Sequence, residues 1–222
     1  LRLGWNVVVH AVGSGVSTAA LQLVKAAGGT VIGTSRTTEK LARARELGMD
    51  HGILVGKEEP RFAEEVRKIT KGRGAHLLLD FVGAPYLGEN LASLASGGRV
   101  VVIGVMGGPK AELDLGAQMR LRASVVGTVL RPRPLEEKVA ATQAFARDVL
   151  PLVAAGRVRP VLDRMKLRIA TTTRRRRAAL PMRRIPSCTT SRSLSRLKRC
   201  GIQWSTAIVA IIRGPPMKPA CA

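Results

Sequence analysis

The sequence predicts an α/β fold in which helices cover both faces of a doubly wound parallel sheet. From residue 5 to about residue 130, short runs of β-branched residues alternate with longer amphipathic stretches. The runs are apolar throughout and lack a period of two, which is typical of strands that are buried on both faces. Several of the runs and stretches are separated by glycines. These observations favour the doubly wound sheet over its alternative, an antiparallel α+β domain.

Strands are expected where β-branched and other apolar residues run together. In chain order they are Trp5–His10, Thr30–Thr34, Ile53–Val55, Ala75–Phe81, Arg99–Gly104 and Ala123–Val129. His10, His51 and His76 fall in these strands or at their ends, and we expect structural roles for all three.

Helices are expected between the strands, where apolar residues recur with a helical period. They are Thr18–Ala27, a segment from about Thr38 to Leu47, Pro60–Thr70 and Leu87–Leu94. Thr37 is the expected N-cap of the second helix, and glycines stop the first two helices at Gly28 and Gly48. Gly97-Gly98 is expected to form a turn before the fifth strand.

A turn of small residues joins the first strand to the first helix. Gly13 and Gly15 fit the first two glycines of a G-x-G-x-x-G pattern, while Thr18 stands at the third position. Small residues allow backbone N–H groups to approach a pyrophosphate, whose charge the N-terminus of the next helix favours. The turn therefore predicts a dinucleotide site, with an ordinary loop as the alternative.

The end of the second strand favours NADP over NAD. Enzymes that use NAD place an Asp or Glu there, about 20 residues after the glycines, to bind the ribose 2′-hydroxyl. Here Arg36 and Lys40 stand in that place, and both can face a 2′-phosphate. Glu39 is the only acid nearby, and it fits the first turn of the following helix. The alternative is that Arg36 and Lys40 are solvated surface charges.

Four stretches of residues 5–165 resemble one known family. They are His10–Ala20, Thr70–Gly74 with Leu79–Gly83, Leu94–Arg99, and Pro160–Arg164. The chain is similar here to the zinc-independent quinone oxidoreductases of the medium-chain dehydrogenase/reductase superfamily. The resemblance implies a Rossmann-type domain and hydride transfer from NADPH to a quinone without a metal.

The resemblance also implies roles for individual residues. Ser14, Gly15 and Val16 would contact the pyrophosphate, and Lys40 would contact the 2′-phosphate. The nicotinamide pocket would be lined by residues that follow the fifth and sixth strands, namely Val105, Met106, Thr128 and Val129. Val55 stands where relatives tend to have a tyrosine beside the adenine, and Ser17 replaces a family glycine. Both departures affect the expected affinity for the cofactor.

An N-terminal catalytic domain precedes the nucleotide-binding domain in this family, and the chain begins with Leu1 almost directly at the latter. We therefore expect a truncated form that keeps the cofactor-binding part. No catalytic residue is assigned, and no metal-ligand spacing is found. The expected partners are a quinone-type small molecule and, through an exposed sheet edge, a further copy of the chain.

The charge divides the chain into two expected segments. The net charge of +22 comes mostly from residues 166–222, which carry 14 basic and no acidic residues, against 23 basic and 15 acidic residues in 1–165. We expect residues 1–165 to form the NADP-binding domain and 166–222 to be a disordered basic tail. The tail has three interpretations: translation of an alternative exon or shifted frame, a non-specific nucleic-acid-binding arm, or a membrane-surface segment. A non-enzymatic nucleic-acid or interaction protein is thus the alternative function.

Composition points to an intracellular protein. The longest apolar runs are too short to cross a membrane, and the N-terminal residues do not resemble a secretory signal. The three cysteines, Cys188, Cys200 and Cys221, all lie in the tail with spacings that match no zinc or redox motif. A cytoplasmic location is therefore expected.

Overall fold

The computed structural model describes residues 1–57 and 59–161. The predicted domain boundary at residue 165 and the basic tail over 166–222 lie outside the described residues.

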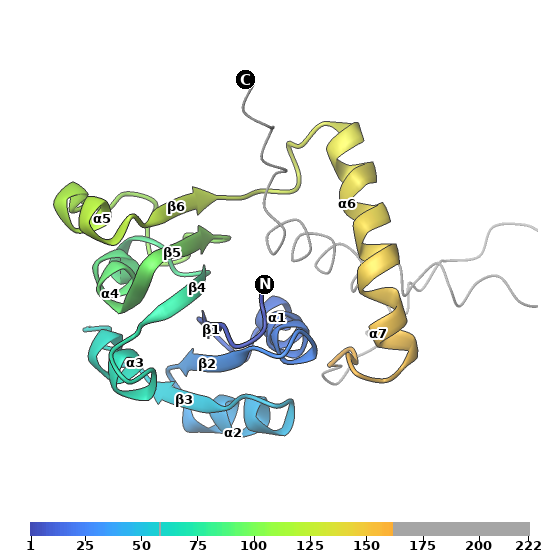
Figure 1. The fold of residues 1–222 in the computed structure, drawn as a ribbon, viewed down its shortest axis with the longest axis horizontal. Coiled ribbons are helices and arrows are strands. Elements are labelled where there is room, and N and C mark those ends of the chain that lie inside the picture. The colour runs from blue at the N-terminus through green and yellow to red at the C-terminus, as the bar shows by residue number, and fades with distance from the viewer. Residues whose placement is uncertain (58, 162–222) are drawn as a thin grey trace, which may run out of the picture.

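One parallel sheet forms the centre of the molecule (Figure 1). Its six strands are β1 (Asn6–Val9), β2 (Thr30–Ser35), β3 (His51–Leu54), β4 (Ala75–Asp80), β5 (Leu94–Val102) and β6 (Ser124–Gly127). Their order in the sheet is β3-β2-β1-β4-β5-β6, and every neighbouring pair is parallel. Strands β2 and β3 are therefore added on one side of β1, and β4, β5 and β6 are added on its other side. This confirms the doubly wound sheet and excludes the antiparallel α+β alternative.

Helices cover both faces of this sheet. They are α1 (Gly15–Ala26), α2 (Thr38–Glu46), α3 (Ala63–Ile69), the 3₁₀ helix η1 (Ala84–Tyr86), α4 (Leu87–Ser93), α5 (Leu115–Leu121), α6 (Leu135–Asp148) and α7 (Leu150–Ala154). One hydrophobic cluster joins α1, α2 and α6 to the sheet, and a second joins α3, α4 and partly α5 to its other face. None of the helices in the described part of the chain combines the length and apolar character that a membrane span needs.

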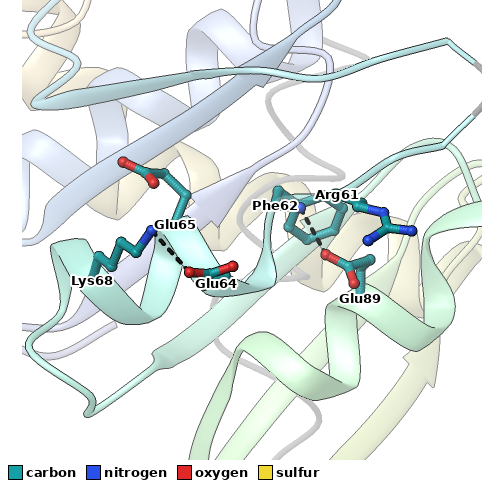
Figure 2. A pocket seen from close by; sticks show the side chains of 6 residues that line it. All are labelled: Arg61, Phe62, Glu64, Glu65, Lys68 and Glu89. Atoms are coloured by element: carbon teal, nitrogen blue, oxygen red, sulfur yellow. Dashed lines mark hydrogen bonds and ion pairs between the residues drawn. The ribbon is translucent and has the colours of Figure 1, made fainter.

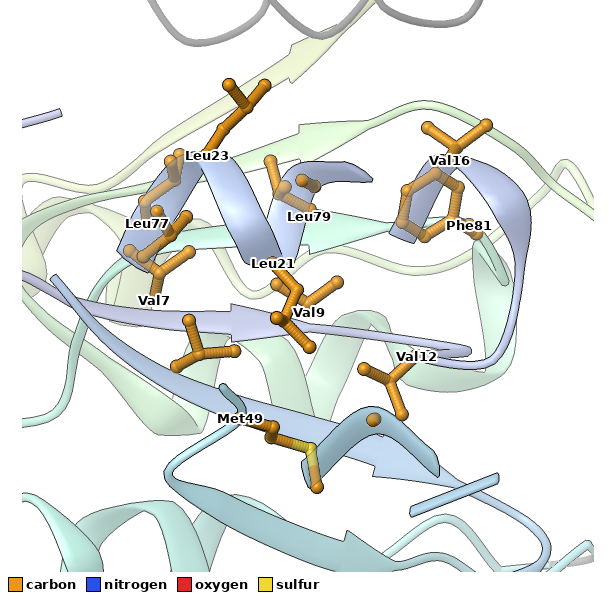
Figure 3. Close-up of a cluster of buried hydrophobic side chains, with 14 of the residues drawn as sticks. Val7, Val9, Val12, Val16, Leu21, Leu23, Met49, Leu77, Leu79 and Phe81 are labelled. Atoms are coloured by element: carbon orange, nitrogen blue, oxygen red, sulfur yellow. The ribbon is translucent and has the colours of Figure 1, made fainter. Parts of the chain in front are cut away.

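Alternate residues of each central strand supply the two clusters. Val7 and Val9 of β1 face the α1 side together with Leu77 and Leu79 of β4, as Figure 3 shows, whereas Val8 enters the other cluster. All five side chains are buried. Continuous apolar runs are thus required because both faces of each strand are covered.

The C-terminal described segment is fixed to α1. Phe145 of α6, Val149 and Val158 belong to the same cluster as the apolar side of α1. The side-chain amide of Gln22 pairs with the backbone of Arg159, donating to its carbonyl over 3.0 Å and accepting from its N–H over 2.8 Å. Phe145 thus brings α6 to the α1 side of the sheet, away from α3 and α4 (Figure 1), and the pairing of Gln22 holds the segment after α7 there.

Several predicted boundaries were wrong. Helix α1 begins at Gly15 instead of Thr18, because the Ser14 side chain accepts from Ser17 N–H and caps the helix three residues earlier. Gly97-Gly98 lies inside β5, where the pairing with β4 shifts register, instead of forming a turn before the strand. Helices α5, α6 and α7 were not predicted, since no apolar residue of α5 is buried and few of α6 are.

Candidate functional site

The turn after β1 is held close to the sheet by backbone hydrogen bonds. Val12 N–H donates to the Thr34 carbonyl over 3.0 Å, and Ser14 N–H donates to the Ala11 carbonyl over 2.8 Å. Ala11 has a φ of +47°, a conformation that costs a non-glycine residue energy. The turn therefore has a defined shape at the carboxyl edge of the sheet, where doubly wound folds bind their ligands.

The N-terminus of α1 presents unused donors. The Ser14 hydroxyl accepts from Ser17 N–H and lies 2.7 Å from the Ser17 hydroxyl, which donates to the His10 carbonyl. The N–H groups of Gly15 and Val16 have no hydrogen-bond acceptor among the described residues. A Cβ atom on Gly15 would meet nothing within 4 Å, so the space beside these donors is open. Such a helix end suits an anion.

Lys40 and Gly13 are in contact. A Cβ atom on Gly13 would lie 2.8 Å from the Cγ and Cδ atoms of Lys40, so the methylenes of this side chain cross directly over the turn. The structure thereby brings together a residue of the predicted phosphate turn and a predicted 2′-phosphate ligand. Both were expected at this edge, although their contact was not.

The acid beside Arg36 and Lys40 is already engaged. Glu39 accepts from Arg43 one helical turn further along α2, over 2.7 Å. In the described part of the chain, neither Arg36 nor Lys40 has an ion pair, and both are exposed. The two cations therefore remain available to an anionic group.

The four predicted nicotinamide residues lie past the ends of β5 and β6, and three of them are exposed. The exposed fraction is 49% for Val105, 77% for Met106 and 61% for Val129. Thr128 is partly buried: its N–H donates to the Val102 carbonyl, and its hydroxyl accepts from Arg133. An apolar rim thus lies at the carboxyl edge of the sheet.

Val55 occupies a different environment from the other predicted cofactor residues. It is 3% exposed and belongs to the cluster that contains Ile53 and Phe62. Its N–H donates to the Ser35 carbonyl over 2.9 Å. Val55 is therefore part of the core beneath the site, and its side chain offers little surface to a ligand. A ligand role for it stays a prediction, as it does for the other predicted site residues.

A buried polar network that the sequence did not predict lies under this edge. His10 contacts the Thr34 hydroxyl through Nδ1 and the Asn90 side-chain oxygen through Nε2, both over 2.7 Å. The Asn90 amide donates to Asp80 over 2.9 Å, and the same carboxylate accepts from the N–H groups of Val82 and Gly83. These contacts join the ends of β1, β2 and β4 to α4. The sequence signal that could have indicated this network is the presence of polar residues, such as His10 and Asp80, at the ends of apolar runs.

The network determines the proton position on His10. Asn90 presents its oxygen to Nε2 because its amide nitrogen donates to Asp80, so Nε2 carries the hydrogen. Nδ1 then accepts from Thr34. Burial lowers the pKa of His10 to about 4, against which the hydrogen bond to Asn90 acts weakly. His10 is therefore neutral at physiological pH.

Asp80 carries the opposite shift. Burial raises the pKa of this carboxyl group, while the hydrogen bonds from Gly83, Val82 and Asn90 act to lower it. Two of these donors are backbone N–H groups directly after β4, so Asp80 fixes the shape of the loop that follows this strand.

The other two histidines differ from each other. His76 accepts from Asn6 N–H over 3.0 Å and stacks on Trp5, a structural role as expected. His51 is exposed at the start of β3.

A hollow of about 330 Å³ lies between α3 and α4 (Figure 2). Its lining residues are Arg61, Phe62, Glu64, Glu65, Lys68 and Glu89. Two of its carboxylates are engaged: Glu64 pairs with Lys68 over 2.9 Å, and Glu89 accepts from Phe62 N–H and Ala63 N–H. The hollow is thus lined by a surface ion pair and a helix cap, and it lies apart from the N-terminus of α1.

The strand order, the turn after β1 and the open helix end define a Rossmann-type nucleotide-binding fold. The zinc-binding dehydrogenase family matches residues 15–146, more than half of the chain, so the protein belongs to that family within the medium-chain dehydrogenase/reductase superfamily. In the described residues no group of three or more His, Cys, Asp or Glu side chains is placed to hold a metal, and we derive no step through zinc.

Two relatives illustrate the range of the family. A zinc-type alcohol dehydrogenase-like protein of Schizosaccharomyces pombe is 32% identical over 166 residues, covering 74% of this chain and 45% of that protein. A quinone oxidoreductase of Homo sapiens is 25% identical over 164 residues, covering 73% and 47%. The chain therefore spans about half the length of these relatives.

Solved structures agree on the fold. A crystal structure titled as an NAD-dependent alcohol dehydrogenase is 32% identical with a TM-score of 0.61, covering 72% of this chain and 43% of that one. A mycobacterial structure complexed with NADPH is 25% identical with the same TM-score, covering 71% and 48%. Relatives of both cofactor types thus share this architecture.

Proposed function

We propose that the described part of the chain is the NADPH-binding domain of an oxidoreductase that transfers hydride to a quinone without a metal. The observation that carries this proposal is the pair of cations at the turn. Arg36 and Lys40 have no acid partner among residues 1–57 and 59–161, because Glu39 is bound to Arg43. A dinucleotide phosphate is the anion that this edge of a Rossmann fold receives.

Each part of the edge then has a task. Gly15 and Val16 N–H groups bind the pyrophosphate, and Lys40 and Arg36 bind the 2′-phosphate. Val105, Met106 and Val129 supply an apolar rim for the nicotinamide and the flat ring of a quinone. When bound, the reduced nicotinamide supplies the hydride, and a quinone that takes up this hydride and one proton becomes a hydroquinone.

Titration calorimetry on the full chain tests the cofactor. NADPH is expected to bind at least tenfold more tightly than NADH, or ~1.4 kcal/mol. The double variant Arg36→Gln/Lys40→Gln should remove this preference, since glutamine keeps the methylenes of Lys40 that lie over Gly13 and loses the charge. Arg45→Gln, in the last turn of α2, is the matched control. Equal or absent binding of the two nucleotides by the wild-type chain would overturn the proposal.

A second measurement addresses the acceptor. When the full chain is mixed with NADPH and an ortho- or para-quinone, the absorbance of NADPH is expected to decrease as it is oxidised. Preferential binding of NADPH without this oxidation would restrict the chain to cofactor binding and refute the quinone reaction for it.

A further inference from the structure

Tyr86 is the only tyrosine in the chain, and it lies at the end of η1, just after β4. Tyr86 is buried, with an exposed fraction of 8%. The ring centroid lies 4.8 Å from that of His10, edge to face, and 5.3 Å from that of Phe62. Three rings from three segments therefore pack together, and they fix the direction in which the tyrosine points.

The hydroxyl group of Tyr86 has no hydrogen-bond partner among the described residues, although the ring is buried. Every fully enclosed side-chain nitrogen or oxygen in that part of the chain does have a partner. The Tyr86 oxygen must therefore reach the surface of the packed rings, where it is a free donor. The hydroxyl group of a buried tyrosine usually forms a hydrogen bond with a protein partner. A tyrosine hydroxyl without such a partner, at an edge where ligands bind, therefore points to a ligand.

Arg36 acts on this hydroxyl group. Burial raises the pKa of Tyr86; the positive charge of Arg36 opposes this shift and the negative charge of Asp80 adds to it. These are the charged groups that face the tyrosine from the ends of β2 and β4. Tyr86 is therefore a neutral donor at physiological pH, close to a cation that has no acid partner in the described residues.

The topology explains why Arg36 and Tyr86 lie at neighbouring strand ends. Strand β1 lies between β2 and β4, so the residues after β2 and after β4 flank the turn that follows β1. His10 spans this gap, because its ring bonds Thr34 of β2 and packs against Tyr86. Arg36, two residues after Thr34, and Tyr86 thus both lie at the carboxyl edge of the sheet, one on each side of the phosphate turn.

We infer that the Tyr86 hydroxyl donates a hydrogen bond to the 2′-phosphate of NADPH beside Arg36, which makes Tyr86 a determinant of cofactor specificity. This inference rests on the proposed function. Tyr86 would be a third residue that binds the 2′-phosphate, and it follows β4, whereas Arg36 and Lys40 follow β2.

Tyr86→Phe removes the hydroxyl group and keeps the ring against His10 and Phe62. One hydrogen bond to a charged group is expected to contribute about tenfold in affinity. The full-length variant should therefore bind NADPH about tenfold more weakly, with NADH affinity and melting temperature unchanged. Thr142→Val, which removes an exposed hydroxyl group on α6, is the matched control and should change neither affinity.

A spectroscopic measurement reads the contact directly. Since the chain has one tyrosine, incorporation of 3-fluorotyrosine gives a single ¹⁹F resonance from Tyr86. Adenosine 2′,5′-bisphosphate should shift this resonance, whereas adenosine 5′-monophosphate should leave it in place.

The outcomes separate the two proposals. A wild-type chain that does not prefer NADPH would overturn the proposed function and this inference with it. If the wild-type chain prefers NADPH, two results for Tyr86→Phe would overturn the role of Tyr86 alone. The variant could keep the whole preference, or it could bind NADPH and NADH more weakly by the same factor. A ¹⁹F resonance that responds identically to both adenosine nucleotides would do the same.

Discussion

His10 Nε2 lies 2.7 Å from the side-chain oxygen of Asn90, a residue 80 positions further along the chain. Both residues are fully buried. Through Asn90 the histidine is connected to Asp80, and through Thr34 to the end of β2. A short chain of hydrogen bonds thus joins three strand ends beneath the candidate cofactor edge.

Replacing Asn90 should test the energetic weight of this network. Asn90→Leu keeps the volume of the side chain but leaves His10 Nε2–H and one Asp80 oxygen without their partner. Unpaired buried groups are costly, so we expect the free energy of unfolding to fall by about 2–4 kcal/mol in urea titrations. Gln143→Leu, at an exposed position of α6, removes a similar amide and should cost little. A small effect at Asn90 would contradict the network.

His10 should make stability depend on pH. Its pKa is about 4 in the folded state and 6.5 when exposed, so the unfolded state takes up the proton first as pH falls. The free energy of unfolding should therefore decrease by roughly 2 kcal/mol between pH 7 and pH 5 from this residue. Asp80, whose pKa is raised, acts in the opposite direction above its ordinary pKa and offsets part of the loss.

The His10 contribution can be isolated by comparison with His10→Gln. The wild-type chain should lose more stability than this variant over the same pH range, measured by urea denaturation at each pH. Parallel curves for the two proteins would show that His10 is not the titrating group.

Glu89 should stabilise α3 from outside that helix. Its Oε2 lies 2.7 Å from both Phe62 N and Ala63 N, at a helix start that has no cap of its own, and Figure 2 draws its bond to Phe62. Glu89→Ala is expected to cost about 1–2 kcal/mol of unfolding free energy, as for lost N-caps. Glu64→Ala removes only a solvent-exposed ion pair with Lys68 and should lower the unfolding free energy much less than Glu89→Ala does. Equal costs in denaturant titrations would refute the cap.

A substitution at Gly15 should change cofactor affinity without changing the stability of the fold. A Cβ atom there meets no protein atom within 4 Å, so Gly15→Ala is expected to leave the melting temperature unchanged. If the pyrophosphate occupies that open space, the same variant should weaken NADPH and NADH about equally in calorimetry, by roughly tenfold or more. Gly127→Ala, at another glycine with open surroundings, is the control. Unchanged binding by Gly15→Ala would place the phosphates elsewhere.

Local patterns were enough to predict much of the fold. The runs that became β1, β2 and β4 were expected to within a residue or two, because a strand covered on both faces must be apolar along its whole length. The turn after β1 was likewise expected, since its small residues are contiguous. The start of α1 was missed by three residues because a serine cap depends on one hydrogen bond.

The residues of the candidate site were predicted from the sequence, whereas the way in which they pack was not. Gly13 and Ser14 lie in the turn after β1, and Gly15 and Val16 begin α1 directly after it. The contact of Lys40 with Gly13 and the burial of Val55 both depend on how separate elements pack. No local sequence pattern singles out Tyr86, because the observation that draws attention to it is a hydroxyl group without a partner among the described residues.

The sequence by itself determined the class of fold, the first strand–turn–helix unit with its small residues, and the uneven distribution of charge along the chain. These depend on composition and on short-range periodicity. Only the tertiary structure decided that Glu39 is bound to Arg43, that His10 is buried and neutral, and that the ring of Tyr86 packs against His10 and Phe62. The reason is physical: hydrogen bonding and desolvation depend on which groups meet in space, and here those groups come from different strands of one sheet.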